Sequence, residues 1–353
     1  MSHVVFEDEQ IQVIYRPGST DYTLVTFTEL GFTPGSGQYW ARAVCEKRDI
    51  ACVAFCAKMP NWYPAASMSA AAPVVADLRL PVLIGYGTSM GGYAALKYSR
   101  LLGLRGVIAC CPQISINPAL IVGQPQYTTH FHPELHAGME ITKGDLSGNA
   151  VVVHDPFFKE DVQHIELLHG SCPGLFTEVR ACFMGHHVPG ALRRWELLEA
   201  LISTARTGAG VERCRTLLRQ QKKLEDRYKI VLAEQMVTRK RYLAVSATLL
   251  NGIVSSTDNL VSMKKYTILS KIAAMSGDLA RAADLAREAA NVYPDNPHLK
   301  AAYGSTLMQA GRHAEAEAAY AEAASIRPGE SAFLQGFAEA RRRQLLVVGN
   351  ALL

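Results

Sequence analysis

The sequence contains no long hydrophobic run and no cationic leader, and each absence excludes a class of protein. No stretch reaches the roughly 18 uninterrupted apolar residues that a membrane helix needs, and the best candidates are broken by Asp77, Arg79 and Pro81. The first residues include acidic side chains where an export signal has a positive start and an apolar segment. We therefore expect a cytoplasmic protein without a membrane span.

The sequence also has no large excess of one charge and no CxxC pair of cysteines. Lys and Arg number 36 against 32 Asp and Glu, a formal net charge of +4, so composition gives no reason to expect a nucleic-acid partner. The eight cysteines lie mostly in apolar segments without the CxxC spacing of zinc sites. We expect reduced core cysteines, no metal and no cofactor.

The remaining features indicate a folded chain whose N-terminal and C-terminal parts have different secondary-structure patterns. Its 353 residues, 49% hydrophobic and 19% charged, suit two units rather than one or three. Up to about residue 200, strand-like and helix-like segments alternate, which predicts an α/β fold with a mostly parallel sheet flanked by helices. Beyond that point strand signals vanish. The expected domains are an α/β domain at residues 1–200, a basic helical connector at 201–260 and helical repeats at 261–345. The expected strands are residues 4–7, 12–15, 23–27, 50–55, 82–86, 106–110, 151–154 and 176–184.

An internal repeat of 34 residues marks the C-terminal part. Gly277 and Gly311 are 34 residues apart, and so are Pro294 and Pro328. Small and aromatic residues recur at the same offset, which resembles the tetratricopeptide repeat, a helix-turn-helix unit. The resemblance implies an all-α region with two repeats over 262–328 and a closing helix at 330–345. Such arrays either bind a protein partner in a groove or serve packing and homo-oligomerisation.

A basic segment at residues 206–241 joins the two parts, with 11 basic against four acidic residues. Its apolar positions recur at helical spacing, so an amphipathic helix is expected. Its basic face is either simply solvated or a contact for an acidic partner or anionic surface.

The most informative segment is a GxSxG pattern between a predicted strand and a predicted helix. In this pattern the serine, here Ser89, occupies a sharp strand-to-helix turn. Side chains two residues before and after it would collide with backbone, and both positions are glycine, Gly87 and Gly91. A helix beginning at Met90 points free N–H groups at the serine, which suits a developing oxyanion. Ser89 is the expected nucleophile.

With this turn, residues 1–200 resemble the α/β-hydrolase superfamily. The segment YGTSMGGYAAL, followed by Pro112 and Gln113, is similar to a bacterial branch often associated with polysaccharide or glycoprotein biosynthesis. The superfamily resemblance implies a catalytic triad in the chain order serine, acid, histidine.

Candidates for the acid and the base follow from that order. Asp155 comes directly after an apolar run and stands at the C-terminal edge of the sheet, so we expect it to orient the base, with Asp161 and Asp145 as alternatives. The loop after the last predicted strand carries two histidines. The run Gly-His-x-Val-x-x-x-Leu looks like the family pattern with His186 as general base, and His187 is the alternate.

The oxyanion hole and the cleft are less clearly marked. The superfamily often shows an HGG-type turn after the third strand, where this chain has FTELG. A backbone N–H of Thr28 or Glu29 is expected to join that of Met90 as donor. Trp62 and Tyr63 follow the fourth strand and are expected to line the substrate cleft, with core packing as the alternative.

A histidine-rich stretch lies in the segment where hydrolases carry a cap. His130, His132 and His136 stand close together with Glu134. Such a set can ligate a transition metal, but without a partner cluster elsewhere we expect a solvated or substrate-lining loop.

These expectations combine into a serine hydrolase that acts on an ester or other acyl bond through an acyl-enzyme on Ser89. The alternatives are an acyltransferase or deacetylase acting on a saccharide or glycoconjugate, and a non-catalytic scaffold in which the repeats bind a partner. The expected partners are a small-molecule or glycan acyl substrate and a protein or second copy at the repeats.

Overall fold

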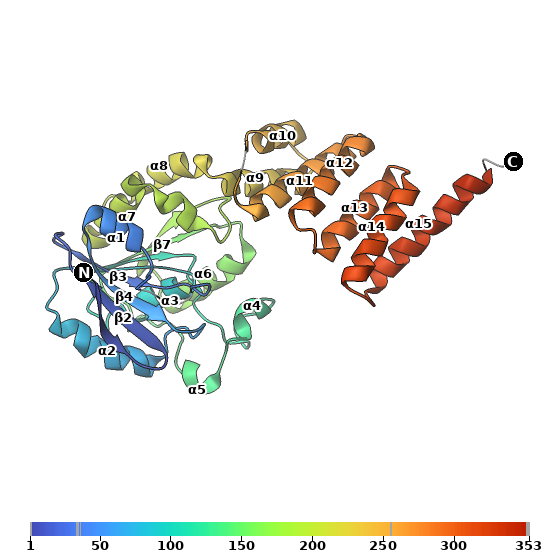
Figure 1. Cartoon of the computed structure of the whole chain (residues 1–353). Helices are drawn as coiled ribbons and strands as arrows, with labels where there is room; N and C mark the ends of the chain where they lie inside the picture. Colours follow the sequence, from blue (N-terminus) through green and yellow to red (C-terminus); the bar gives the residue numbers. More distant parts are fainter. Residues whose placement is uncertain (1, 33–34, 36, 255, 351–353) are drawn as a thin grey trace. The chain divides into compact units, whose positions relative to one another are not determined.

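The computed structural model describes residues 2–32, 35, 37–254 and 256–350. The chain divides into two compact units, Met1–Glu225 and Asp226–Leu353. The first is an α/β unit and the second is entirely helical among its described residues (Figure 1). The predicted order of an α/β fold followed by a helical-repeat region is confirmed.

The α/β unit is built on one sheet of eight strands in the order β1-β2-β4-β3-β5-β6-β7-β8. Strand β2 pairs antiparallel with β1 and β4, and every other pairing is parallel. The carboxyl ends of β3 to β8 therefore meet at one edge of the sheet. The strands are β1 His3–Glu7, β2 Ile11–Arg16, β3 Thr23–Phe27, β4 Ala51–Ala57, β5 Leu83–Thr88, β6 Gly106–Cys110, β7 Asn149–His154 and β8 Phe176–Arg180.

Helices cover both faces of this sheet. Side chains of α2, α3 and α6 share a core with β2–β7, and α7 packs against β5, β6 and β7 (Figure 1). The central strands β3, β4 and β6 are buried along their whole length, which explains their continuous apolar sequence. The helices are α1 Arg42–Arg48, α2 Ala65–Asp77, α3 Met90–Lys97, α4 Pro125–Thr128, α5 Pro133–His136, α6 Lys159–Ser171, α7 Trp195–Thr207 and α8 Val211–Gln221, with 3-10 turns at Val188–Arg193 and Lys222–Leu224.

The last strand is shorter than its sequence indicates. The apolar pattern predicts a strand over 176–184, but β8 ends at Arg180. Phe183 and Gly185 both have positive φ, 66° and 57°, and extended pairing cannot continue through that conformation. The chain turns there instead and carries the two histidines in a loop.

The helical unit contains the repeat that the sequence predicts. Gly277 and Gly311 occupy equivalent turns between paired helices, with φ of 84° and 72°, a conformation that glycine adopts at little cost. Asp258 and Asn296 accept hydrogen bonds from the first N–H groups of α11 and α13. The helices are α9 Asp226–Thr238, α10 Leu243–Asn251, α11 Asn259–Met275, α12 Leu279–Val292, α13 Pro297–Gln309, α14 His313–Ile326 and α15 Ser331–Asn350.

The basic segment at 206–241 is not one joining helix. It is divided among the end of α7, α8, a 3-10 turn and α9, and the boundary between the two units falls within it, after Glu225. Separately, no helix among the described residues has the length and apolar character needed to cross a bilayer.

Candidate active site

Ser89 occupies a strained turn between β5 and α3. Its φ of 55° and ψ of −121° are rare for a residue with a side chain. A Cβ at Gly87 would lie 2.3 Å from the carbonyl oxygen of Gly91, and a Cβ at Gly91 would lie 2.4 Å from that of Phe27. The turn therefore requires glycine at both positions, as the GxSxG pattern predicts.

Backbone bonds fix this turn against the end of β6. The Ser89 N–H donates to the carbonyl of Cys110 at 2.9 Å, and the Gln113 N–H donates to the carbonyl of Ser89 at 3.3 Å. The Ser89 hydroxyl donates to Oε1 of Gln113 at 3.1 Å. Only 4% of Ser89 is exposed, so its hydroxyl is held in an enclosed space beside a buried amide.

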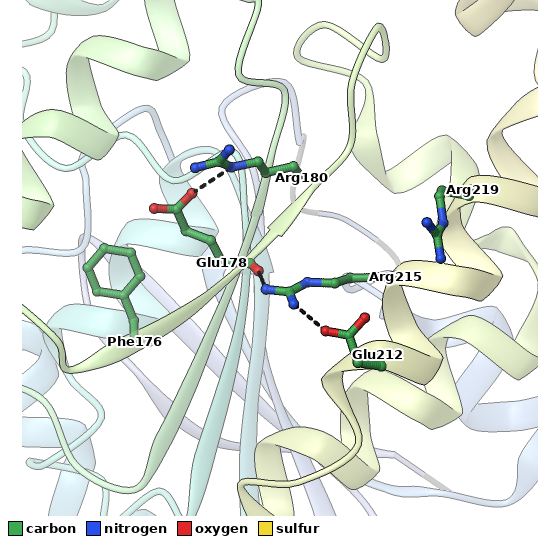
Figure 2. Close-up of a pocket in the computed structure, with 6 residues that line it drawn as sticks. All are labelled: Phe176, Glu178, Arg180, Glu212, Arg215 and Arg219. Atoms are coloured by element: carbon green, nitrogen blue, oxygen red, sulfur yellow. Dashed lines mark hydrogen bonds and ion pairs between the residues drawn. The ribbon is translucent and has the colours of Figure 1, made fainter.

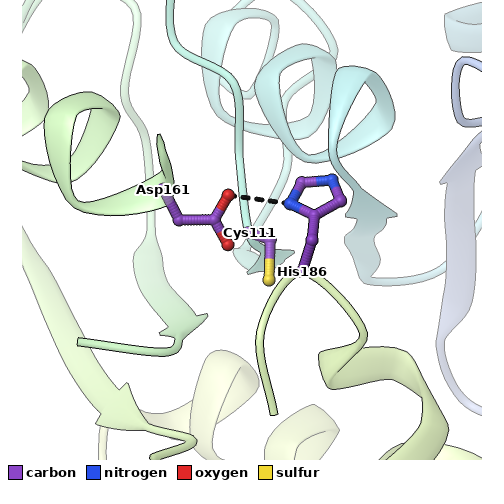
Figure 3. Close-up of side chains that lie close together, drawn as sticks. All are labelled: Cys111, Asp161 and His186. Carbon is purple, nitrogen blue, oxygen red and sulfur yellow. Dashed lines mark hydrogen bonds and ion pairs between the residues drawn. The ribbon is translucent and has the colours of Figure 1, made fainter. Parts of the chain in front are cut away.

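His186 is paired with Asp161. The imidazole Nδ1 lies 2.7 Å from the Asp161 Oδ1, and Figure 3 shows the carboxylate directed at the ring. Asp161 lies in the first turn of α6 and is buried, whereas His186 is half-buried. Burial disfavours the imidazolium, but the hydrogen bond and charge of Asp161, together with the charges of Glu29 and Glu160, outweigh it and raise the pKa of His186. A carboxylate on Nδ1 leaves Nε2 as the nitrogen able to take up a proton.

The structure gives this contact to Asp161, one of the two alternatives, instead of Asp155. Both Asp155 oxygens accept backbone N–H groups, Oδ1 from Phe157 at 3.0 Å and Oδ2 from Gly185 at 2.7 Å. Asp155 thus ties the end of β7 to the loop that carries His186. Asp145 is also engaged elsewhere, with Lys97 at 3.1 Å.

The two candidate histidines lie in different surroundings. His187 is exposed and directly precedes the 3-10 turn, whereas His186 is half-buried against the rings of Tyr127 and Phe158, at centroid distances of 6.3 Å and 6.2 Å. The contact with Asp161 singles out His186 as the candidate base.

One of the expected oxyanion donors is already occupied. The Thr28 N–H donates to the carbonyl of Phe55 at 3.1 Å, and its hydroxyl lies 2.9 Å from the Tyr63 hydroxyl. Thr28 therefore stabilises the end of β3, and its N–H is not available to an oxyanion. The Glu29 N–H is the other candidate for the second oxyanion donor. The Glu29 side chain is half-buried, and burial raises its pKa, against which the charge of His186 acts.

The two aromatic residues expected in the cleft are both buried. Tyr63 is 0% exposed, and its hydroxyl contacts the carbonyls of Thr28 and Phe55, so it is a core residue. Trp62 is 1% exposed, but its ring lies 6.4 Å from Tyr127 and 5.9 Å from His130. Trp62 thus packs against Tyr127 and His130 instead of lining an open cleft.

One histidine of the stretch 130–136 is held by hydrogen bonds at both ring nitrogens. His136 is buried, its Nδ1 accepts the N–H of His132 at 2.9 Å, and its Nε2 therefore donates to the carbonyl of Asn61 at 3.0 Å. Both ring nitrogens form hydrogen bonds, so His136 connects residues 132–136 to Asn61, which directly precedes Trp62 in the chain.

A different trio has atoms close enough for a metal ion. The Sγ of Cys111 and ligand atoms of Asp161 and His186 lie within 4.8 Å of one another (Figure 3). Metal binding requires a thiolate, but burial, followed by the charge of Asp161, raises the pKa of the Cys111 thiol. Without a metal ion the thiol is therefore protonated beside the carboxylate, and the side-chain contact that the trio shows is the hydrogen bond between His186 and Asp161.

A pocket of about 480 Å³ lies on another part of the α/β unit, between edge strand β8 and α8 (Figure 2). Its charged groups are largely paired with one another. Arg215 is bonded to Glu212 and to the carbonyl of Glu178, and Arg180 to the Glu178 side chain. The arginine side chains that line this pocket lie along the outer edge of the sheet, and charged side chains there disfavour pairing with a further strand.

Comparison with known proteins identifies the repeats. Residues 273–339 match the tetratricopeptide repeat family. Comparison with curated proteins gives no match.

Solved structures that align with part of the chain do so at low identity and low TM-scores. The capsule O-acetyltransferase of Neisseria meningitidis serogroup A has a TM-score of 0.43 at 14% identity, over 56% of this chain and 93% of that one. The N-formylmaleamic acid deformylase of Pseudomonas putida has a TM-score of 0.35 at 13% identity, over 54% and 95%. A MamA protein has a TM-score of 0.32 at 18% identity, over 42% and 81%. Scores this low do not establish a shared function.

Proposed function

We propose that the α/β unit is an acyl-handling enzyme of the serine hydrolase type, in which Ser89 is the nucleophile, His186 the base and Asp161 the residue that orients the base. The observation that carries this proposal is the 2.7 Å pair of His186 and Asp161, which follows strands whose carboxyl ends lie at the same edge of the sheet as the buried Ser89 on its strained turn. Residues at the end of β6 and just after it contact both groups. Ser89 is bonded to Cys110 and Gln113, and the Sγ of Cys111, which lies between those two in the chain, is within 4.8 Å of ligand atoms of Asp161 and His186.

The reaction follows from the chemistry of these groups. His186 Nε2 takes the Ser89 proton as Oγ attacks the acyl carbonyl, and Asp161 stabilises the imidazolium that forms. The N–H of Met90, and that of Glu29 as second donor, stabilise the oxyanion. The proton then passes to the leaving group, and an ester remains on Ser89. A hydroxyl compound repeats the sequence in reverse and releases the acyl group.

The chemical class of the acceptor separates the variants of this function. If water accepts the acyl group the protein is a hydrolase, such as an esterase or deacetylase, and if a saccharide hydroxyl accepts it the protein is an acyltransferase. The resemblance of residues 86–96 to proteins of polysaccharide biosynthesis supports the saccharide acceptor.

The test is turnover of a short-chain nitrophenyl ester by the full chain. Ser89→Ala should abolish turnover and leave the melting temperature nearly unchanged. Ser67→Ala, which removes a buried hydroxyl on α2, is the matched control and should retain full activity. Turnover by Ser89→Ala at the wild-type rate would refute the proposal.

For the helical unit, we propose docking of a protein partner or a second copy of the chain. Its last helix, α15, exposes an apolar group near its end: Leu345, Leu346 and Val347 are between 54% and 65% exposed. Exposed apolar side chains in a cluster are typical of contact surfaces. Replacing all three by Gln should lower the mass measured by light scattering if copies associate there. If the wild type is already a monomer, the homo-oligomer is excluded and the protein partner remains.

A further inference from the structure

Gln113 is a buried polar residue that contacts the proposed nucleophile, and the proposed triad mechanism assigns it no role. It is 0% exposed and lies just after β6, where its N–H is bonded to the carbonyl of Ser89. Gly92 allows this approach, since a Cβ there would lie 3.2 Å from Pro112. The Gln113 amide is therefore fixed against the reacting oxygen.

The two ends of this amide are unequally satisfied. Oε1 accepts the Ser89 hydroxyl at 3.1 Å, whereas the buried Nε2 makes no hydrogen bond of ordinary length among the described residues. A buried donor without a good partner costs about 1–3 kcal/mol, and in a native structure such a group calls for an explanation. Burial raises the pKa of the Tyr127 phenol, and a weak hydrogen bond from the Gln113 side chain acts against that rise, so the phenol is within reach of the amide.

Acylation of Ser89 changes what the amide can bind. In the free protein the Ser89 hydroxyl donates a hydrogen bond to Oε1. An ester oxygen carries no hydrogen, so it cannot donate one. Oε1 of this fully buried amide then has no partner, and Nε2 has only the weak contact with Tyr127, next to the acyl carbon. A hydroxyl group is small and carries both a donor and acceptor lone pairs, so it can satisfy either end.

The sheet order indicates which reacting group meets the amide. Strand β5 lies between β3 and β6, so Gln113, after β6, flanks Ser89 on the side opposite the candidate oxyanion donor Glu29, after β3. His186, which follows β8, comes from the same side as Gln113. The oxygen that exchanges its proton with His186 is the attacking hydroxyl, and the Gln113 amide lies on its side of the serine.

We propose that Gln113 is a further catalytic residue, whose amide binds the hydroxyl that attacks the acyl-enzyme. This inference rests on the proposed acyl transfer through Ser89. The hydroxyl gives its proton to His186 Nε2 as its oxygen bonds to the acyl carbon. Water can donate a hydrogen bond from its second O–H to Oε1 without losing that proton, whereas an alcohol has only one O–H and accepts a hydrogen bond from Nε2 after rotation of the amide. The bond from the acyl carbon to Oγ then breaks, and Oγ recovers the proton from His186 and donates again to Oε1.

The test separates the two halves of the reaction. Nitrophenolate leaves without needing a proton, so its release by excess enzyme measures acylation alone. Disappearance of the acetyl adduct, followed by intact mass, measures deacylation. Gln113→Met, which keeps the shape and removes the amide, should leave acylation within about threefold and slow deacylation at least about tenfold, the rate equivalent of one hydrogen bond. Gln221→Met, which removes another buried amide of this unit, should change neither.

Addition of glycerol distinguishes the two hydroxyl sources. Faster wild-type deacylation with glycerol, lost in Gln113→Met, supports the proposal with an alcohol as acceptor. No acceleration, with slower hydrolysis in the variant, supports it with water. Should Gln113→Met not fold, Gln113→Asn retracts the same amide by one methylene and should show the same split.

Equal slowing of acylation and deacylation, or no change in either, would overturn the role of Gln113 while acyl transfer through Ser89 stands. A wild type that never acquires an adduct and never turns over the ester would overturn both proposals.

Discussion

Replacing Asp161 and Asp155 by asparagine, one at a time, separates the proposed orienting acid from a structural carboxylate. In Asp161→Asn the amide can donate to Nδ1 of His186 and hold the imidazole in the wrong tautomer. This change in a serine-protease triad lowers kcat by about 10⁴, so a loss of about 10³–10⁴, or ~4–5 kcal/mol of transition-state stabilisation, is expected. The unfolding free energy should change little, because an amide keeps the shape and one acceptor.

Asp155→Asn should show the opposite pattern. Asparagine has one oxygen for the two N–H groups of Phe157 and Gly185 that the carboxylate accepts at 3.0 Å and 2.7 Å. Loss of one charge-assisted bond costs about 1.5–3 kcal/mol of stability. Ester turnover per folded molecule should fall far less than in Asp161→Asn.

The assay combines urea unfolding with nitrophenyl ester turnover, both on protein whose near-ultraviolet circular dichroism matches the wild type. A larger loss of kcat in Asp155→Asn than in Asp161→Asn, at equal folded fraction, would refute the assignment and return Asp155 to the triad.

Three further perturbations test the surroundings of the site. Burial lowers the pKa of His164 to about 4, so the unfolded chain binds this proton first, and stability present above pH 6.5 should fall by about 3 kcal/mol towards pH 4; His164→Gln should lack that part of the slope in urea titrations. Burial alone would lower the pKa of His186, but the nearby carboxylates raise it by more, so its net pKa is raised. We therefore expect kcat/KM to fall as the pH drops through a value above 6.5, and Glu29→Gln to move this acid limb of the pH profile to lower pH. A limb that does not move in Glu29→Gln would contradict the electrostatic argument. Gly87→Ala should unfold or severely destabilise the protein because its Cβ would lie 2.3 Å from a carbonyl oxygen, whereas Gly170→Ala, which meets nothing within 4 Å, should be tolerated; equal melting temperatures would contradict the packing argument.

The periodicity of the sequence predicts the sheet well because its strands are buried on both faces. Strands β3 and β6 begin and end where the apolar runs do. Strand β8 lies at the edge and alternates in exposure, so its end is set by the backbone turn at Phe183 and not by hydrophobicity. The 34-residue offset likewise predicts the paired helices, since each glycine turn must recur once per repeat.

The site was only partly predictable, because a motif fixes backbone and leaves side-chain partners open. The GxSxG pattern dictates the turn at Ser89 through its two glycines. Asp155 has the expected place after β7, but its carboxylate bonds to backbone, whereas Asp161, in the first turn of α6, reaches the histidine. Gln113 was visible as part of a motif, yet no spacing rule indicates that its amide meets Ser89.

Covalent labelling with a fluorophosphonate tests the central claim, a reactive Ser89, most directly. The full chain is treated with the probe, digested, and the modified residue located by peptide mass mapping. The account predicts one modified site, Ser89, with labelling abolished in Ser89→Ala and strongly slowed in Asp161→Asn. Labelling of another residue, or equal labelling of wild type and Ser89→Ala, would contradict it.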